Sequence, residues 1–412
     1  MEELSMKKRY RRVFVLLFLL CSVPSQGCGD DQLLRSAWDA AVVGGTVNDQ
    51  HARLLLDTGA DGTGIEIRLL TEMRIALQRE RKIRAPSGTT QVRFYEPIGI
   101  GIDGFETVRV TPGGIELAGL NLGGHVSFDG LVGMDVLNRH TVLISRGIVS
   151  LRERVPAEFP VVETFATGDR VEDRADLPVS MSEFGVREFR VDTGMTDACQ
   201  FNDRLVKDML HRGALVRGST AKVTDIRGAQ IIDRFVLREL TVAGVKCRNV
   251  PVSTGQYNAI GLELLRHMNL ALDFPRRQIL IGKPPQDVVD RFAINASGMA
   301  VGFDSAEALK VLAIRPDSSA ETAGVQAGDV IVQLDGRSPA ELSIYDIHDI
   351  LARDSKTISV VFCRGQDEHY IELPLQLPFE YPPNWAALDA RQKDFEKFLE
   401  KLESDPAPAA KP

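Results

Sequence analysis

The chain has 412 residues, of which 44% are hydrophobic and 26% are charged. This length predicts two or three domains, with enough apolar residues for several cores. The formal net charge of −8 leaves no basic footprint for nucleic acid, so we expect no nucleic-acid partner.

The N-terminus has the pattern of an export signal over residues 1–27. Basic residues within 7–12 precede the apolar run 13–23, which is too short for a comfortable transmembrane helix, and small residues follow. A short uncleaved anchor is the alternative reading. Both readings predict a protein outside the cytosol, in the bacterial periplasm or cell envelope.

Cys28 directly follows this expected cleavage junction. Bacterial lipoproteins are acylated on a cysteine in such a place, and the position is similar to theirs. The residues before Cys28 depart from the lipoprotein pattern, however. Attachment to a membrane through an acylated Cys28 and plain export therefore both stay open.

An Asp-Thr-Gly tripeptide occurs twice, each time at the end of a short apolar run. The copies are Asp57-Thr58-Gly59 and Asp192-Thr193-Gly194. A single copy would be an ordinary turn after a strand. Two copies suggest paired carboxylates, which cannot both ionise easily when they lie close together. Such a pair offers an acid and a base in one site.

The residues downstream of each tripeptide repeat as well. Leu131-Val132-Gly133 follows the first copy and Ala259-Ile260-Gly261 the second. An Arg-His pair and then a strand-like run come after each of these segments. This self-similarity predicts a duplicated half-domain, with one half over 38–152 and the other over 153–283.

With these motifs the chain resembles the retropepsin-like aspartic proteases. The resemblance implies a mainly β, bilobal, pepsin- or retropepsin-like fold, with both halves in one chain. It implies catalysis by Asp57 and Asp192, which would activate water for peptide-bond hydrolysis. It also implies a supporting role for the other loop residues, Thr58, Gly59, Thr193, Gly194, Gly133 and Gly261. The glycines would let backbone approach the carboxylates.

A different pattern begins after residue 290. A glycine-punctuated strand near Gly298 is followed by Ser319-Ala320, an Ala-Gly pair and Gly328-Asp329-Val330-Ile331. This string resembles a PDZ domain (an α+β module), which we expect over 293–376. The resemblance implies that peptide C-termini bind at a loop formed by Gly298, Met299, Ala300 and Val301. A PDZ domain that only packs against the rest of the chain is the alternative.

The last segments predict a helix over 384–403, which we expect to dock on the body, and a disordered tail over 404–412. Cys199 and Cys247 could form a disulfide or remain buried thiols. The histidines show no zinc-ligand spacing, so we expect neither a metal nor an organic cofactor. The sequence therefore predicts an exported aspartic-type endopeptidase acting on peptide or protein substrates. A non-catalytic, peptide-binding envelope protein with a degenerate protease fold is the alternative.

Overall fold

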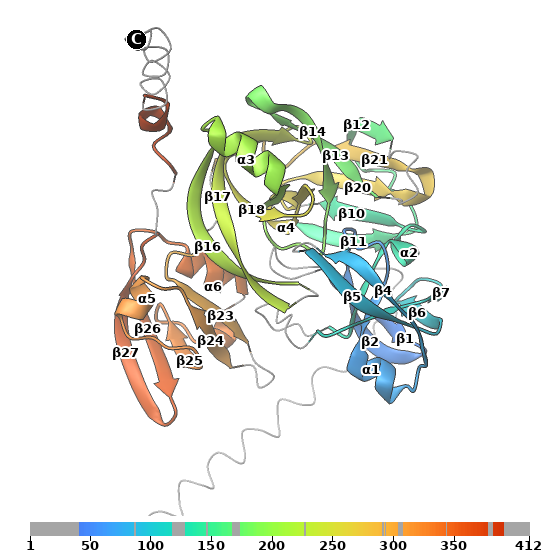
Figure 1. Ribbon diagram of the computed structural model, residues 1–412, viewed down its shortest axis with the longest axis horizontal. Coiled ribbons are helices and arrows are strands. Elements are labelled where there is room, and N and C mark those ends of the chain that lie inside the picture. Colours follow the sequence, from blue (N-terminus) through green and yellow to red (C-terminus); the bar gives the residue numbers. More distant parts are fainter. Residues whose placement is uncertain are drawn as a thin grey trace, which may run out of the picture. The chain divides into compact units, whose positions relative to one another are not determined.

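The computed structural model describes residues 41–85, 88–117, 128–145, 147–166, 174–225, 228–290, 292, 294–303, 308–342, 344–377 and 382–390. Strands dominate these residues and form four sheets, which confirms the expected mainly β class (Figure 1). The expected signal peptide, Cys28, the tail and all but the start of the C-terminal helix lie outside the described residues. Within the described parts, no helix is long and apolar enough to cross a membrane.

The first half contributes a nine-stranded sheet in the order β4-β5-β8-β3-β9-β2-β1-β6-β7. Its strands are β1 (Val42–Val47), β2 (Gln50–Leu56), β3 (Gly64–Glu66), β4 (Leu77–Ala85), β5 (Gly88–Tyr95), β6 (Ile98–Ile102), β7 (Val108–Val110), β8 (Gly113–Ile115) and β9 (Gly130–Val132). The two short helices are α1 (Ile67–Glu72) and α2 (Met134–Leu137). Asn48 and Asp49 both adopt positive φ in the two-residue β1–β2 turn, a conformation that these residue types tolerate.

The second half contributes an eight-stranded sheet in the order β16-β17-β13-β14-β19-β15-β18-β22. Its strands are β13 (Asp176–Met181), β14 (Gly185–Val191), β15 (Cys199–Asn202), β16 (Leu215–Asp225), β17 (Gly228–Val242), β18 (Val245–Gly255), β19 (Ala259–Ile260) and β22 (Val288–Val289). Helix α3 (Asp203–His211) begins where the Asn202 side chain accepts a hydrogen bond from the Leu205 amide at 3.0 Å. Helix α4 (Leu262–Leu265) follows β19.

A five-stranded sheet, in the order β11-β10-β20-β21-β12, joins the two halves. Its strands are β10 (Thr141–Ser145), β11 (Ile148–Arg152), β12 (Val161–Ala166), β20 (Asn269–Asp273) and β21 (Gln278–Gly282). Strands β10 and β20, which end the two sequence repeats, pair with each other antiparallel at its centre. Figure 1 shows this sheet between the two larger ones. Most of the buried apolar residues of these three sheets form one continuous core.

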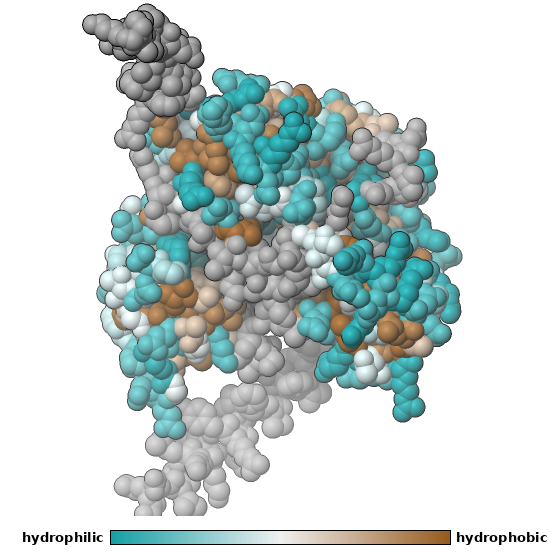
Figure 2. All heavy atoms as spheres, in the orientation of Figure 1, coloured by the Kyte–Doolittle hydropathy of each residue, from teal (hydrophilic) through white to brown (hydrophobic). Residues whose placement is uncertain are grey.

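A long hairpin occupies a corresponding place in each half. Strands β4 and β5 follow α1, and strands β16 and β17 follow α3. The β4 residues Arg79, Glu80, Arg81 and Lys82 are all exposed, so both faces of this strand meet solvent. Figure 2 shows hydrophilic side chains over this part of the surface. Sequence reasoning did not identify either hairpin.

The C-terminal sheet has the order β23-β24-β25-β26-β27 and packs in a second apolar core, which also includes Val236 of β17. Its strands are β23 (Met299–Phe303), β24 (Leu309–Ile314), β25 (Val330–Leu334), β26 (Thr357–Arg364) and β27 (Asp367–Pro374). Helices α5 (Ser319–Thr322) and α6 (Ile344–Leu351) accompany it. The Ser318 hydroxyl accepts a hydrogen bond from the Glu321 amide at 3.3 Å and so caps α5.

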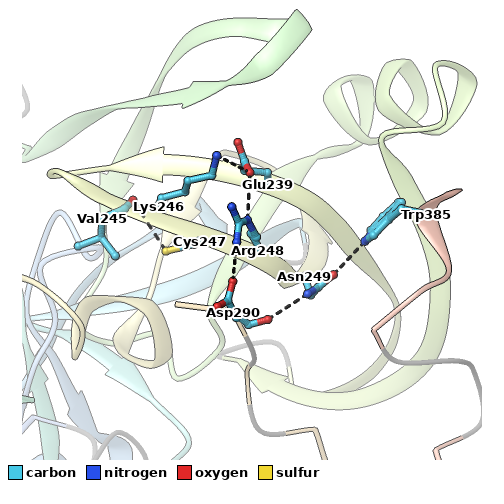
Figure 3. Close-up of polar contacts among 8 residues, drawn as sticks. All are labelled: Glu239, Val245, Lys246, Cys247, Arg248, Asn249, Asp290 and Trp385. Atoms are coloured by element: carbon cyan, nitrogen blue, oxygen red, sulfur yellow. Dashed lines mark hydrogen bonds and ion pairs between the residues drawn. The ribbon is translucent and has the colours of Figure 1, made fainter. Parts of the chain in front are cut away.

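Residues 385–390 are helical and contact β17 and β18. Trp385 donates a hydrogen bond from Nε1 to Oδ1 of Asn249 at 2.9 Å, and Asn249 in turn donates to the Asp290 carbonyl at 2.9 Å (Figure 3). The Arg238 guanidinium lies 4.7 Å from the Trp385 ring centre and pairs with Asp389. The start of the C-terminal helix therefore docks on the second half.

Candidate active site

Both Asp-Thr-Gly tripeptides occupy the same local structure. Each aspartate directly follows a strand that pairs in parallel with a short strand from its own half, β2 with β9 and β14 with β19. The Asp57 amide donates to the Val132 carbonyl at 3.0 Å, and the Asp192 amide donates to the Ile260 carbonyl at 2.9 Å. The sequence repeat thus builds two equivalent strand ends.

The two carboxyl groups lie together, each against the glycine of the opposite tripeptide. A Cβ atom added to Gly59 would collide with the carboxyl group of Asp192, and one added to Gly194 would collide with that of Asp57. Only glycine leaves room for this approach. The structure therefore brings Asp57 and Asp192 together, as the sequence predicted.

The two threonines join the tripeptides reciprocally. The hydroxyl of Thr58 donates to the Val191 carbonyl at 2.7 Å, and the hydroxyl of Thr193 donates to the Leu56 carbonyl at 2.7 Å. Each hydroxyl also accepts the backbone amide of the other threonine at 3.1 Å. Both side chains are buried. Buried hydrogen bonds of this kind fix the two loops relative to each other.

Backbone amides support the carboxylates from below. Oδ1 of Asp57 accepts from the amides of Gly59 at 2.9 Å and Ala60 at 3.0 Å. Oδ1 of Asp192 accepts from the Gly194 amide at 3.0 Å. These donors favour the ionised form of each carboxyl group.

Burial opposes these donors and dominates the titration of the pair. Burial, and then the nearby Asp192 charge, raise the pKa of Asp57 to about 8. Burial also raises the pKa of Asp192, although the Arg190 guanidinium and the backbone amides counteract part of that rise. A pair of this kind retains one shared proton across mildly acidic and neutral pH. One carboxyl group can then donate a proton while the other accepts one.

Gly133 and Gly261 pack directly beneath the two loops. A Cβ atom on Gly133 would collide with the Gly62 backbone, and one on Gly261 would collide with backbone oxygens of Met195 and Asp197. The residue after each glycine donates its amide to the loop above, Met134 to Ala60 at 2.9 Å and Leu262 to Met195 at 2.8 Å. The structure therefore places Gly133 and Gly261 beneath the two Asp-Thr-Gly loops.

Two further residues lie at the site, and the sequence analysis missed both. Arg190 of β14 donates from Nη1 to the Gly59 carbonyl at 2.7 Å, and its guanidinium lies 4.5 Å from the ring centre of Tyr257. The charges of Asp192 and Asp57 both act on the Tyr257 hydroxyl, whose pKa is raised chiefly by burial. The sequence signal was a charged residue inside the apolar run before Asp192.

The expected peptide-binding loop lies at the start of β23. Gly298 has a φ of +82°, and a Cβ atom there would collide with Ser318. In the described residues β23 pairs with β24 alone, so its other edge is free to accept an extended peptide. The Met299 side chain is buried in the domain core. The Met299 amide donates to the Ser297 hydroxyl at 3.0 Å and its carbonyl accepts from the Asn295 side chain at 2.7 Å, whereas Ala300 and Val301 continue the edge of β23.

Cys199 and Cys247 are buried free thiols. Among the described residues, no group of three or more His, Cys, Asp or Glu side chains could hold a metal ion.

Comparison with known proteins identifies the C-terminal module. A family model described as PDZ domain matches residues 310–364. The chain contains a PDZ domain. The chain is also 33% identical over 104 residues to a C-terminal processing peptidase, chloroplastic, from Tetradesmus obliquus. That match covers 24% of this chain and 20% of the relative, so the chain spans about a fifth of the length of that protein.

A solved structure, the photosystem II D1 C-terminal processing protease, is 29% identical over a match that covers 22% of this chain and 25% of that one. The TM-score is 0.20. What the chain shares with these proteins is a limited segment, and the family model places a PDZ domain at residues 310–364.

These findings correct the assignment to the aspartic type of endopeptidase. The relatives that the comparisons give are C-terminal processing proteases, which point to a peptidase but not to an aspartic one. The comparisons do not support the resemblance to retropepsin-like proteases either, and the bilobal, pepsin-like fold is not confirmed by them. The PDZ assignment is confirmed, and the chain is similar over part of its length to a C-terminal processing peptidase.

Proposed function

We propose that this chain acts on peptides, that the carboxyl pair of Asp57 and Asp192 transfers protons in that reaction, and that its PDZ domain binds peptide C-termini. One observation carries the proposal: each carboxyl group packs against the glycine of the opposite tripeptide, and burial there raises the pKa of both Asp57 and Asp192.

The pair has the groups that amide hydrolysis without a covalent intermediate requires. The ionised carboxylate accepts a proton from a water molecule as that water attacks the peptide carbonyl carbon. The protonated carboxyl donates its proton to the carbonyl oxygen, and a proton then passes to the departing nitrogen. Thr58 and Thr193 hold the two loops, and with them the two carboxyl groups, in fixed positions relative to each other.

The two hairpins, β4–β5 and β16–β17, are the segments that we assign to substrate contact. Each extends from its half after the helix that follows the Asp-Thr-Gly loop. Several side chains of β4 face solvent on both faces of the strand. A strand with both faces open can contact an extended peptide through its backbone and its side chains.

The PDZ domain would select substrates or regulators by their free C-termini. The free edge of β23 supports backbone pairing, and the loop at Gly298 supports carboxylate capture by amides. The N-terminal pattern of residues 1–27 supports export, so the substrates would be envelope or extracytoplasmic peptides and proteins. Attachment of a lipid to Cys28 after export is part of the same proposal.

A peptide-library digest tests the proposed function. The full chain should cleave a subset of peptides, and an Asp57→Asn variant should cleave none of them, because the amide cannot share the proton. The near-isosteric amide preserves packing, and circular dichroism should show an unchanged fold. Equal cleavage by both proteins would place the activity elsewhere. An absence of cleavage by the wild type over the tested pH range would favour a peptide-binding role.

A further inference from the structure

The Arg190 side chain extends from the second half of the chain and contacts the Asp-Thr-Gly loop of the first half. It lies on β14 two residues before Asp192, and its Nη1 donates to the carbonyl of Gly59, which follows Asp57 in the other tripeptide. The face of its guanidinium packs on Tyr257 with 4.5 Å to the ring centre. A half-buried cation needs such partners, and the carbonyl oxygen and the aromatic face supply them.

The first half has no such cation at the equivalent position. Leu55 stands there, two residues before Asp57, and it packs in a small apolar cluster with Leu131. Leu55 is paired with Leu131 in the parallel ladder, whereas Arg190 is paired with Ala259. The small alanine leaves space where the first half has a leucine. The residue that pairs with each position therefore differs along with it: alanine faces Arg190, and leucine faces Leu55. The two halves of the site are not symmetric at this position.

We propose that Arg190 is a positioning residue that makes the two carboxyl groups unequal, by holding the Gly59 peptide and by keeping a positive charge on the Asp192 side of the pair. The catalytic meaning of this inference rests on the proposed function. The Gly59 carbonyl shares its peptide unit with the Ala60 amide, which donates to Asp57 at 3.0 Å, while the carbonyl itself accepts from Arg190 at 2.7 Å. This peptide unit is therefore fixed at both ends, and successive hydrogen bonds strengthen one another.

The charged and titratable groups around Arg190 are few. Asp192 and Asp57 belong to the pair, Tyr257 lies under the guanidinium, and Asp61 acts on the Tyr257 hydroxyl from the first loop. Arg174 forms a bidentate ion pair with Asp61, with nitrogen–oxygen distances of 2.8 Å. The positive charge of Arg190 favours an ionised carboxylate. Among the interactions that lower the pKa of Asp192 it is the largest, whereas among those that lower the pKa of Asp57 it ranks below the backbone hydrogen bonds.

Without Arg190, the pair would hold its proton to higher pH and its two members would be more alike.

The test measures titration separately from catalysis. Full-length protein with 13C-labelled aspartate carboxyls would be titrated by NMR for the wild type, Arg190→Leu, Arg190→Gln and Arg190→Lys. Leucine is the residue of the first half, glutamine can keep the bond to Gly59 without the charge, and lysine keeps the charge. Arg187→Leu is the matched control, because Arg187 is exposed on the same strand and donates to Val186. The pH–rate profile would be recorded for the same proteins.

We expect Arg190→Leu and Arg190→Gln to raise the lower of the two macroscopic pKa values of the pair by about one unit. The ionised fraction below that value then falls about tenfold, and the acidic limb of the pH–rate profile moves up equally. Arg190→Lys should restore most of the wild-type titration, and Arg187→Leu should leave it unchanged. If the folded Leu and Gln variants both titrate like the wild type, the inference is wrong.

The two readouts separate this inference from the proposed function. Shifted titration in a protein that hydrolyses no peptide would support the role of Arg190 in the pair while contradicting hydrolysis. Unshifted titration in an active protease would contradict the role of Arg190 alone. If the Leu variant does not fold, the Gln variant decides the question, because it keeps a side chain of similar polarity in the same space.

Discussion

Thr58 and Thr193 hold each other across the centre of the site, the amide of each donating to the hydroxyl of the other at 3.1 Å. Because each hydroxyl also donates to a strand carbonyl of the opposite half, four buried backbone groups depend on two side chains. The two loops are therefore one structural unit, and this unit places the carboxyl groups.

Replacement of Thr58 by valine should destabilise the whole three-sheet body. The variant keeps the shape but leaves the Val191 carbonyl and the Thr193 amide without a partner, at a cost of about 2–4 kcal/mol in the free energy of unfolding. Thr193→Val should cost a similar amount, and the double variant should cost less than the sum because the two share their bonds. Denaturant unfolding measures all three.

Thr71→Val is the matched control for this series. Thr71 is an exposed residue on α1 whose hydroxyl donates to the Ile67 carbonyl at 2.8 Å. Its replacement should change the unfolding free energy by no more than about 0.5 kcal/mol. Equal effects of Thr58→Val and Thr71→Val would contradict the reciprocal arrangement.

Gly59→Ala should abolish activity, because its methyl group would occupy the place of the Asp192 carboxyl. The carboxyl group must move, and the shared proton is lost with it. Gly62→Ala is the control in the same loop: its added methyl group would meet only the Asp135 carboxylate oxygen, at an ordinary 3.7 Å. Peptide cleavage and thermal unfolding should therefore distinguish the two variants. A fully active Gly59→Ala protein would be incompatible with this site geometry.

The stability of the protein should fall as the pH rises through the titration of the pair. The pKa of Asp57 is raised to about 8 in the folded state, mainly by burial, from an ordinary value near 3.8. The stability linked to this group is therefore complete below the ordinary value and is lost as the pH passes through about 8. Denaturation midpoints recorded over this range should decrease for the wild type.

Asp57→Asn removes this titration, so its midpoints should depend less on pH. The variant should be more stable than the wild type at alkaline pH, because it avoids a second buried charge beside Asp192. The same proton linkage predicts an activity optimum from mildly acidic to near-neutral pH. Parallel stability curves for the two proteins would show that the pair does not hold a proton with a raised pKa.

Gly298→Ala should impair the PDZ domain at its loop. The added methyl group would collide with Ser318, and φ at this position is +82°, which strains any residue other than glycine. We expect at least a tenfold loss in the affinity for peptides with a free C-terminus, measured by fluorescence anisotropy with the amidated peptides as controls. Cleavage of short internal peptides should persist. Unchanged affinity would place the peptide elsewhere on the domain.

The sequence predicted the pairing of Asp57 with Asp192 because a duplication is visible wherever both copies keep the same residues. Thr58, Thr193, Gly133 and Gly261 were found in the same way, and the structure places all of them at or beneath the two loops. The PDZ domain was found from a long run of local motifs. Short motifs and an internal repeat can both be recognised in the sequence without a structure.

Features that occur in only one of the two sequence repeats were not predicted. Arg190 breaks the repeat at the position of Leu55, and nothing in the linear sequence says that its side chain reaches Gly59 in the other half. Tyr257 joins the site only because β19 lies beside β14. The contact of Trp385 with Asn249 likewise joins residues far apart in the chain. The assignment to the aspartic type of endopeptidase was wrong, because the curated relative that matches is a C-terminal processing peptidase.

The most direct test of the account is the rate of cleavage of one identified peptide by Asp57→Asn, Asp192→Asn and the double variant. If the two carboxyl groups share a proton and act as a unit, each single variant should lose activity completely, and the double variant should be no worse. Near-wild-type turnover in either folded single variant would contradict the account.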